Sequence, residues 1–274
     1  MPSTAPNRPG TLYLVPTPLD FGCTPEQGAA HPAIDLHLPQ GTLHTAARLT
    51  HWITENAKST RAFLKRVDAV CPLGQPLQAQ SIAELPRQAH KKGDHDPAVA
   101  SDDQAKQLLA PAQQGHDMGL VSEAGMPAIA DPGSSVVRAA HALGIPVVPL
   151  TGPVSLMLAL AASGLNGQHF AFVGYVPHEA SERAKRLREL EALALKTGQT
   201  QIFIETPYRN TALLQALLQT LQPQTRLAVC SGLTLPQQHC RSALVGQWRS
   251  QNGNGSAGAA AAPMDAPAVF LIGR

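Results

Sequence analysis

The sequence predicts an α/β protein that consists of two domains. Its length of 274 residues suits two domains rather than one. Short apolar runs alternate with helical segments, and loops rich in glycine and proline follow the runs, an order typical of parallel α/β sheets. We expect a disordered leader over residues 1–10, an N-terminal α/β domain over 11–151 and a C-terminal α/β domain over 152–274.

Apolar runs that stop at proline, glycine or polar residues mark the expected strands. They comprise residues 11–17, 118–121, 145–150, 169–177, 200–210, 226–230, 242–248 and 266–273. Residues 42–70 suit a passage from strand to helix, in which Phe63, Leu64 and Val67 share one helical face. Residues 72–105 are polar and broken by proline, so we expect a long loop or flap there.

Four later segments predict helices from their apolar periodicity and their end residues. They are residues 134–144, 155–164, 179–196 and the segment after 210 that aligns Leu214, Leu217, Leu218 and Leu221. The first two begin near serine and end at Gly144 and Gly164, residue types that are common at helix ends.

Two loops interrupt the strand-to-helix passage with glycine and proline. The first, "VSEAGMPAIADPGSS" over residues 121–135, also holds two carboxylates, and the second is "TGPVS" over residues 151–155. In a parallel sheet the loops beyond the carboxyl ends of the strands form the ligand crevice. A tight turn alone explains one such loop, whereas two in succession favour a ligand site.

The composition limits the classes of function. Lys and Arg number 21 against 19 Asp and Glu, so any RNA contact must be local. The four cysteines lack metal-site spacing, which favours free thiols in a reducing compartment, with the cytoplasm as the default. Neither a signal peptide nor an apolar run long enough to span a membrane occurs, so we expect a cytoplasmic protein without membrane contact.

Several other motifs are weak in their context. Gly253, Gly255 and Gly258 satisfy G-x-G-x-x-G, but they lie in a low-complexity Gly/Ala/Ser loop that neither follows a strand nor opens a helix, so nicotinamide binding is not expected. The polar cluster at 90–96 lacks a rigid element to hold metal ligands, and we expect no metal. The cluster members are His90, Asp94, His95 and Asp96.

A basic run lies within the expected helix 179–196 and admits two interpretations. Its members are Arg183, Lys185, Arg186 and Arg188. They suit RNA phosphates, but a solvated helix face with Glu–Arg pairs explains them as well and is preferred.

Six short segments of the chain form an ordered set of motifs: "VPTPL" (15–19), "TENAKSTRAFL" (54–64), "VSEAGMPAIADPG" (121–133), "GPVSLMLALAASGL" (152–165), "GYVP" (174–177) and "IETPYRN" (204–210). They resemble motifs of the tetrapyrrole methylase superfamily, and within it of the branch that contains ribosomal RNA 2'-O-methyltransferases. The resemblance covers residues 11–273 in the order of the family, and a set of motifs in order is far more specific than one alone.

The resemblance implies two α/β domains of the tetrapyrrole methylase type, with S-adenosylmethionine in the cleft between them, and a homodimer. The 121–135 loop would be a cofactor shelf, in which Gly125 lets the backbone approach the ligand while Pro127 and Pro132 keep the loop rigid. The cofactor-binding residues so implied are Pro16, Thr17, Glu123, Gly125, Pro127, Ala128, Gly152, Pro153, Ser155, Ile204 and Glu205.

Four carboxylates of the implied site each admit two interpretations, one functional and one structural. Glu123 and Glu205 suit a sulfonium or a ribose, yet either can be structural. Glu55 is the candidate general base toward a ribose hydroxyl, although an acid at a helix start is also favoured by the helix dipole. Asp131 is expected either on the shelf or as a helix cap.

Departures from the family pattern lie mostly on the side of the methyl acceptor. Asn56 replaces an acid, Asp20 and Phe21 replace Gly-Asn, Tyr208 replaces His, and the His-Asn-Glu stretch expected before the shelf is missing. The first hypothesis is therefore an S-adenosylmethionine-dependent RNA methyltransferase. The alternatives are a methyltransferase of a small or tetrapyrrole acceptor, and a cofactor-binding protein without turnover.

Overall fold

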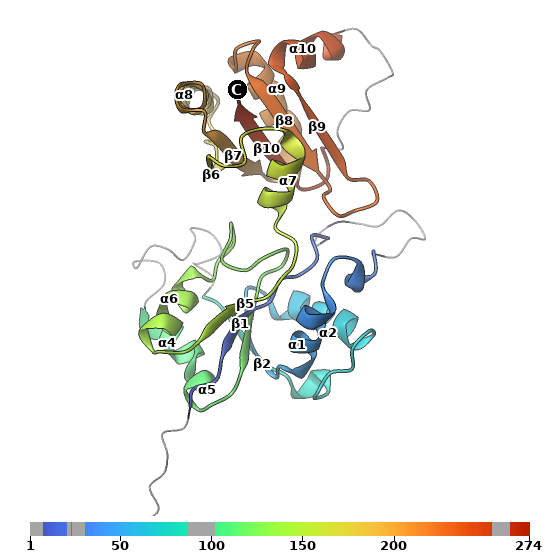
Figure 1. Ribbon diagram of the computed structural model, residues 1–274, viewed down its shortest axis with the longest axis vertical. Helices are drawn as coiled ribbons and strands as arrows, with labels where there is room; N and C mark the ends of the chain where they lie inside the picture. The colour runs from blue at the N-terminus through green and yellow to red at the C-terminus, as the bar shows by residue number, and fades with distance from the viewer. Residues whose placement is uncertain (1–7, 21–22, 24–30, 87–101, 254–263) are drawn as a thin grey trace, which may run out of the picture. The chain divides into compact units, whose positions relative to one another are not determined.

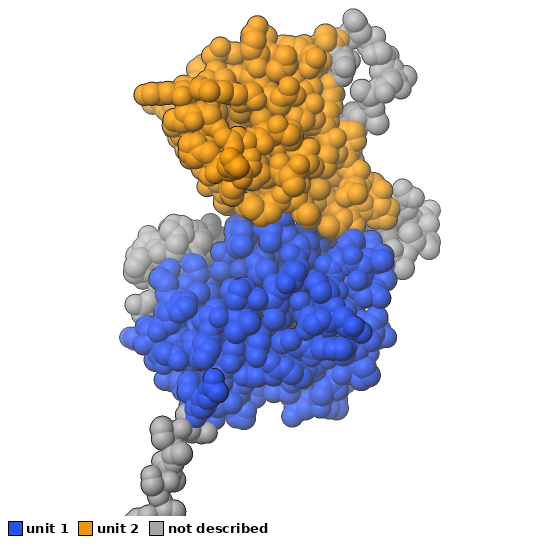
Figure 2. All heavy atoms as spheres, in the orientation of Figure 1, with its two compact units in different colours: residues 1–154 blue, residues 155–274 orange. Residues whose placement is uncertain are grey.

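A computed structural model describes residues 8–20, 23, 31–86, 102–253 and 264–274. The chain divides into two compact units, Met1–Val154 and Ser155–Arg274, which are coloured separately in Figure 2. The leader expected over residues 1–10 falls largely on 1–7, outside the described residues, as do the polar cluster at 90–96 and most of the low-complexity loop.

The first unit contains a five-stranded sheet in which every described pairing is parallel. The strands are β1 (Leu12–Leu14), β2 (His51–Thr54), β3 (Ser81–Glu84), β4 (Met118–Val121) and β5 (Val147–Pro149). Their order is β3-β2-β4-β1-β5. All four residues of β4 are buried, as expected of a strand with a parallel neighbour on each side.

Helices cover both faces of this sheet, and each face has its own apolar core. The helices are α1 (Gln40–Arg48), α2 (Ala57–Asp68), α4 (Asp102–Leu108), α5 (Ala110–Gln113) and α6 (Ser134–Ala142), with short 3-10 turns at Ile34–Leu36 and Leu77–Ala79. One cluster packs α1 and α2 against Trp52 and Val121, and the other packs α4 to α6 against Leu12 and Leu120. The parallel α/β sheet expected from the sequence is confirmed for this unit.

The second unit contains a mixed sheet of order β6-β7-β10-β8-β9. Its strands are β6 (Phe170–Tyr175), β7 (Thr200–Glu205), β8 (Arg226–Ser231), β9 (His239–Leu244) and β10 (Ala268–Gly273). Only β6 and β7 pair in parallel in the described sheet, whereas β10 runs antiparallel to both β7 and β8. The α/β class is confirmed, but the parallel sheet expected from the repeated strand–helix pattern is restricted to the first unit.

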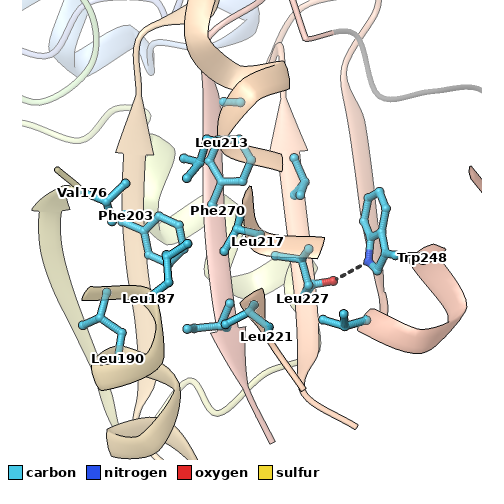
Figure 3. Packing of buried hydrophobic residues seen from close by; sticks show 14 residues of the cluster. Val176, Leu187, Leu190, Phe203, Leu213, Leu217, Leu221, Leu227, Trp248 and Phe270 are labelled. Atoms are coloured by element: carbon cyan, nitrogen blue, oxygen red, sulfur yellow. Dashed lines mark hydrogen bonds between the residues drawn. The ribbon is translucent and has the colours of Figure 1, made fainter. Parts of the chain in front are cut away.

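Helices lie on both faces of the second sheet as well (Figure 1). They are α7 (Ser155–Ser163), α8 (Ala180–Thr197), α9 (Asn210–Thr220) and α10 (Val245–Gly253), with a 3-10 turn at Pro207–Arg209. Figure 3 shows leucines of α8 and α9 packed on Phe203 and Phe270, with Trp248 of α10 donating its indole N–H to the Leu227 carbonyl at 3.0 Å. That bond satisfies the polar atom of a side chain that is otherwise buried in the core.

Three element predictions need correction. Residues 72–105 were expected as a loop, but Ser81–Glu84 form strand β3. This strand lies at the edge of the sheet and pairs only with β2, which suits its partly exposed "SIAE" run. The expected strand 242–248 ends at Leu244, and Val245 begins α10, where Trp248 enters the core. Residues 42–70 were expected to hold one helix, but helix α1 (Gln40–Arg48) occupies the start of this segment before the strand, in addition to the predicted α2.

Candidate functional site

The carboxyl ends of all five strands of the first sheet lie at one edge, because those strands run parallel. The loops that leave this edge include residues 15–20 after β1, 55–56 after β2, 122–133 after β4 and 150–154 after β5. Such an edge is where α/β proteins place their ligands. The structure therefore brings the expected site residues of the first unit to one edge.

Thr17 and Gly125 join the first and third of these loops. The two residues form an isolated antiparallel bridge, with Thr17 N donating to Gly125 O at 2.9 Å and Gly125 N donating to Thr17 O at 3.1 Å. The Thr17 hydroxyl also donates to Ser122 O at 3.3 Å. This Thr17–Gly125 bridge ties the start of the expected shelf to the end of β1.

The backbone of the 121–135 loop turns repeatedly through the left-handed region. Gly125 has φ +80°, and Ala128 and Ala130 both have φ 64°. An L residue adopts that region at a cost of about 1–2 kcal/mol, and such outliers concentrate at ligand sites because the surrounding structure has to hold them. The Ala128 amide donates to Pro132 O at 3.3 Å, which closes the turn.

Gly152 lies against the loop after β1. A Cβ atom at Gly152 would meet Pro16 Cγ at 2.2 Å and Pro16 Cβ at 2.5 Å, so only glycine permits this approach. The next residue, Pro153, has its carbonyl oxygen 3.5 Å from the position that a Cβ of Gly125 would take. Pro16, Gly125, Gly152 and Pro153 therefore belong to one packed group.

Three carboxyl groups gather at the ends of β2 and β4. Glu55 Oε2 accepts from the backbone N of Glu123 at 3.0 Å, which fixes the start of the shelf to the end of β2. The pKa of Asp131 is raised to about 7, first by burial and then by the negative charges of Glu55 and Glu123, while hydrogen bonding to Ser122 opposes the rise. A carboxyl group that titrates near neutrality can both accept and release a proton under cellular conditions.

Asp131 does not occupy the N-cap position of α6. The residue at the N-cap of α6 is Gly133, and Ser134 is the first residue of the helix rather than its cap. Asp131 is not recognisable as a titrating group from the sequence, because its pKa depends on burial and on Glu55, which is remote in the chain. The indication in the sequence was that Glu55, Glu123 and Asp131 all lie in loops that follow the ends of parallel strands.

Two cavities lie in the first unit near this edge: Thr17 lines one of them, and Met126, the residue after Gly125, lines the other. The Lys58 cavity, of about 440 Å³, is lined by Thr17, Pro18, Asp20, Cys23, His31, Asn56, Lys58, Ser59, Ala62, Phe63, Arg66 and Glu123. The Ala128 cavity, of about 420 Å³, is lined by Leu14, Met126, Pro127, Ala128, Ile129, Ser134, Val137, Arg138 and Pro149. Both volumes fall in the range of about 300–1,000 Å³ that is usual for small-ligand sites.

The Lys58 cavity has a basic wall formed by α2. Asn56 caps this helix by accepting from Lys58 N at 2.9 Å. Arg66 pairs with the buried Asp20 at 2.9 Å, and the same helix carries Arg61 and Lys65, both exposed at least in part. Asp20 and Asn56, which depart from the family pattern, are thus a charge partner and a helix cap.

The remaining expected residues belong to the second unit. Ser155 is the first residue of α7, and Ile204 and Glu205 end β7. Glu205 is 6% exposed, and its Oε1 accepts from Arg209 Nη2 at 2.6 Å and from Thr206 N at 2.8 Å. The structure therefore gives the Glu205 carboxylate local partners at the 3-10 turn after β7.

Residues 51–248 match the family model described as Tetrapyrrole (Corrin/Porphyrin) Methylases. The chain belongs to this family. It is 29% identical over 246 residues to "Ribosomal RNA small subunit methyltransferase I" of Escherichia coli O157:H7, covering 89% of this chain and 72% of that protein. The protein of the same name from Xylella fastidiosa is 31% identical over 223 residues, with 81% and 68% covered.

Solved structures with the same fold are more distant in sequence. The methyltransferase CobJ has a TM-score of 0.51 and 16% identity, with 97% of this chain and 94% of that chain covered. Native uroporphyrin III C-methyltransferase from Thermus thermophilus has a TM-score of 0.50 and 15% identity, covering 97% and 98%. These likenesses support the fold of the tetrapyrrole methylases.

Membership of this family of S-adenosylmethionine-dependent methyltransferases confirms three expectations from the sequence: the family, a methyltransferase activity and the methyl donor. Across the described ranges, no helix is long and apolar enough to cross a membrane. Within the same ranges no group of three His, Cys, Asp or Glu side chains is arranged to hold a metal ion.

Proposed function

We propose that the protein methylates RNA, with a ribose hydroxyl or a base of ribosomal RNA as the acceptor and S-adenosylmethionine as the methyl donor. The relatives that cover most of the chain are named ribosomal RNA small subunit methyltransferase I, which supports an RNA acceptor. The observation that carries the proposal is the Thr17–Gly125 bridge, with one cavity for each reactant beside it.

The Ala128 cavity is the proposed place of the methyl donor. Apolar side chains dominate its lining, which suits the adenosyl and methionyl parts of the donor. The proposed contacts of the first unit are Pro16, Thr17, Glu123, Gly125, Pro127, Ala128, Gly152 and Pro153. Of these, Pro127 and Ala128 line the Ala128 cavity, whereas Thr17 and Glu123 line the Lys58 cavity. Ser155, Ile204 and Glu205 are the proposed contacts from the second unit.

Glu205 fits a positioning role better than direct pairing with a sulfonium. Its carboxylate already neutralises Arg209 and holds the amide of Thr206. We therefore propose that Glu205 fixes the turn after β7.

The Lys58 cavity is the proposed place of the acceptor nucleotide. The helix that forms its wall carries Lys58, Arg61, Lys65 and Arg66 against a single acid, Asp68. Cations near phosphates give RNA binding its strong dependence on salt. This surface is a stronger candidate for RNA than α8, where Arg186 pairs with Glu189 at 3.3 Å and the acids are interspersed.

Methyl transfer from a sulfonium is an in-line displacement, so the protein acts mainly by orienting the two reactants and excluding water. A ribose hydroxyl has to lose its proton as the new O–C bond forms, and a carboxylate can accept it. We propose Asp131 as this acceptor, because its pKa of about 7 matches neutral conditions. Glu55, the acceptor expected from the sequence, remains the second candidate, although it already binds the Glu123 amide.

Binding of the donor tests the core of the proposal. Titration calorimetry with S-adenosylmethionine is expected to show binding to the wild type and loss of binding in Gly125→Trp. The matched control is Gly144→Trp, since Gly144 has a similar φ of +66° but open space around it. Equal affinity of the two variants would remove the shelf from the site, and a folded wild type without any binding would refute the methyltransferase proposal.

Transfer of a labelled methyl group then separates the candidate acceptors. Turnover with ribosomal RNA that falls steeply with salt supports RNA, because phosphate contacts release counterions. Turnover with a small or tetrapyrrole acceptor that is insensitive to salt would support that alternative. Binding without turnover on either class would favour a cofactor-binding protein that lacks activity.

We further propose a cytoplasmic homodimer. Phe170, Phe172 and Tyr175 of edge strand β6 are 38%, 36% and 57% exposed, and exposed aromatic side chains of this kind favour association. Sedimentation of the wild type against Phe172→Glu tests the dimer. A wild type that sediments as a monomer at micromolar concentration would contradict it.

A further inference from the structure

Cys230 and Cys240 face each other across the hairpin formed by β8 and β9. The two strands run antiparallel, and the register places Cys230 directly opposite Cys240. Both are free thiols in this structure. Opposed residues of an antiparallel pair lie on the same face of the sheet, so the two side chains are neighbours.

The hydrogen-bond pattern identifies this pair as one without backbone bonds between its members. Val245 N donates to Thr225 O at 2.9 Å, so Thr225 and Val245 form a hydrogen-bonded pair. Bonded and unbonded pairs alternate along antiparallel strands, and Cys230 is an odd number of residues from Thr225, so it belongs to an unbonded pair. On the other side of β8, Gly232 N donates to Pro267 O at 3.0 Å, so the amide of Cys230, two residues earlier, also faces β10. Both hydrogen bonds therefore indicate that Cys230 and Cys240 form a pair without backbone hydrogen bonds between them.

Unbonded pairs bring the strands closest together. Their Cα atoms are about 4.5 Å apart, inside the range of about 4.4–6.8 Å that a disulfide spans. The hairpin therefore holds the two cysteines at bridging distance without any movement of the backbone.

The two thiols differ in access and in protonation. Cys230 is 1% exposed, and burial raises the pKa of its thiol, with a further contribution from Cys240. Cys240 is exposed and forms part of the wall of a cavity of about 430 Å³, whose other lining residues are Leu158, Ala162, Leu233, Thr234 and Gln238. A small oxidant can thus reach Cys240, whereas Cys230 remains protonated behind it.

We propose that Cys230 and Cys240 form a reversible dithiol–disulfide site that responds to peroxides. The Cys240 sulfur attacks the peroxide, whose O–O bond breaks; the sulfur is oxidised to a sulfenic acid and the peroxide is reduced to an alcohol or water. The Cys230 thiol then attacks that sulfur, an S–S bond forms, and the hydroxyl leaves as water with the Cys230 proton. An external dithiol restores both thiols by exchange and becomes oxidised itself.

The disulfide changes one contact of α7 directly. Cys230 Sγ lies 3.8 Å from the Ala159 carbonyl of α7, to which the thiol donates. Oxidation removes that S–H donor and fixes edge strand β9 to β8. The oxidised unit is expected to melt several degrees higher, because the cross-link restricts the unfolded chain.

Peroxide treatment of the full chain tests the site, in a Cys23→Ser/Cys71→Ser background that leaves only this pair. Peptide mapping with differential alkylation is expected to find the Cys230–Cys240 disulfide after hydrogen peroxide and two thiols after a phosphine reductant. In Cys230→Ser, dimedone is expected to trap Cys240 as a sulfenic acid, and in Cys240→Ser, residue 230 is expected to stay reduced.

Three outcomes would overturn the proposal. The first is oxidation of Cys240 to sulfinic acid, or to a disulfide between chains, while Cys230 remains open to alkylation after unfolding. The second is that peroxide leaves both thiols unmodified. The third is a rise of the melting temperature on oxidation that is equal in Cys240→Ser, since the cross-link is absent there.

Discussion

Replacing Asp131 by asparagine provides the most direct test of the carboxyl cluster. The unfolded chain ionises this group near its ordinary pKa of 3.8, whereas the folded protein keeps its proton up to a pKa of about 7. Folding therefore takes up a proton between these two values, and the free energy of unfolding falls as the pH rises from 4 to 7. At about 1.4 kcal/mol per pKa unit the fall is at most about 4 kcal/mol.

An asparagine side chain cannot ionise, so the Asp131→Asn variant lacks this fall. We expect the wild type and Asp131→Asn to have similar free energies of unfolding near pH 4, and Asp131→Asn to be more stable by up to about 4 kcal/mol near pH 8. Urea unfolding at several pH values between 4 and 8 measures the difference. Glu123→Gln is the matched control, because it removes one negative charge that raises the pKa of Asp131 and should shrink the fall without abolishing it.

The same variant tests the proposed proton transfer. Activity toward a ribose hydroxyl should rise with pH and level off above about 7 in the wild type, and Asp131→Asn should lose about 10²–10⁴-fold in kcat while donor affinity is kept. A difference in stability that stays constant from pH 4 to 8 would refute the raised pKa. Full kcat in the variant would refute the role as proton acceptor and favour Glu55.

Three further substitutions probe packing. Gly152→Ala should cost about 1–3 kcal/mol, measured by urea unfolding, because its Cβ would meet Pro16 Cγ at 2.2 Å; an unchanged stability would disprove the close approach. Gly41→Ala, in α1 with nothing within 4 Å of its Cβ, should instead gain about 0.5–1 kcal/mol, and a loss would contradict open space there. Trp248→Phe leaves the Leu227 carbonyl without its indole donor and should lower the free energy of unfolding by about 1–3 kcal/mol; a neutral result would show that the bond contributes nothing net.

Local chemistry in the sequence predicted most strands, the later helices and the first parallel sheet. Pro16 stops the first strand, glycines end the helices near 144 and 164, and the apolar face of α2 is visible from Phe63, Leu64 and Val67. The prediction failed where tertiary pairing decides. The strand Ser81–Glu84 carries little apolar signal and exists because β2 pairs with it.

The candidate site, like the fold, was predictable from the sequence only in part. Its loops were predictable, because glycine and proline mark unusual turns wherever they occur. The pKa of Asp131 was not predictable, because it depends on burial and on the charge of Glu55, a residue from a different strand end. The partners of Glu205 were likewise invisible until Arg209 and Thr206 were placed around it.

The order of the first sheet has a consequence for how the chain assembles during synthesis. Strand β1 is the first made, yet its partners are Met118–Leu120 and Val147–Pro149. One edge of β1 must therefore wait until Met118–Leu120 has been made and the other until Val147–Pro149 has been made, and such non-local pairing folds slowly. The Thr17–Gly125 bridge joins the same distant parts of the chain, so binding of the donor would report that they have come together.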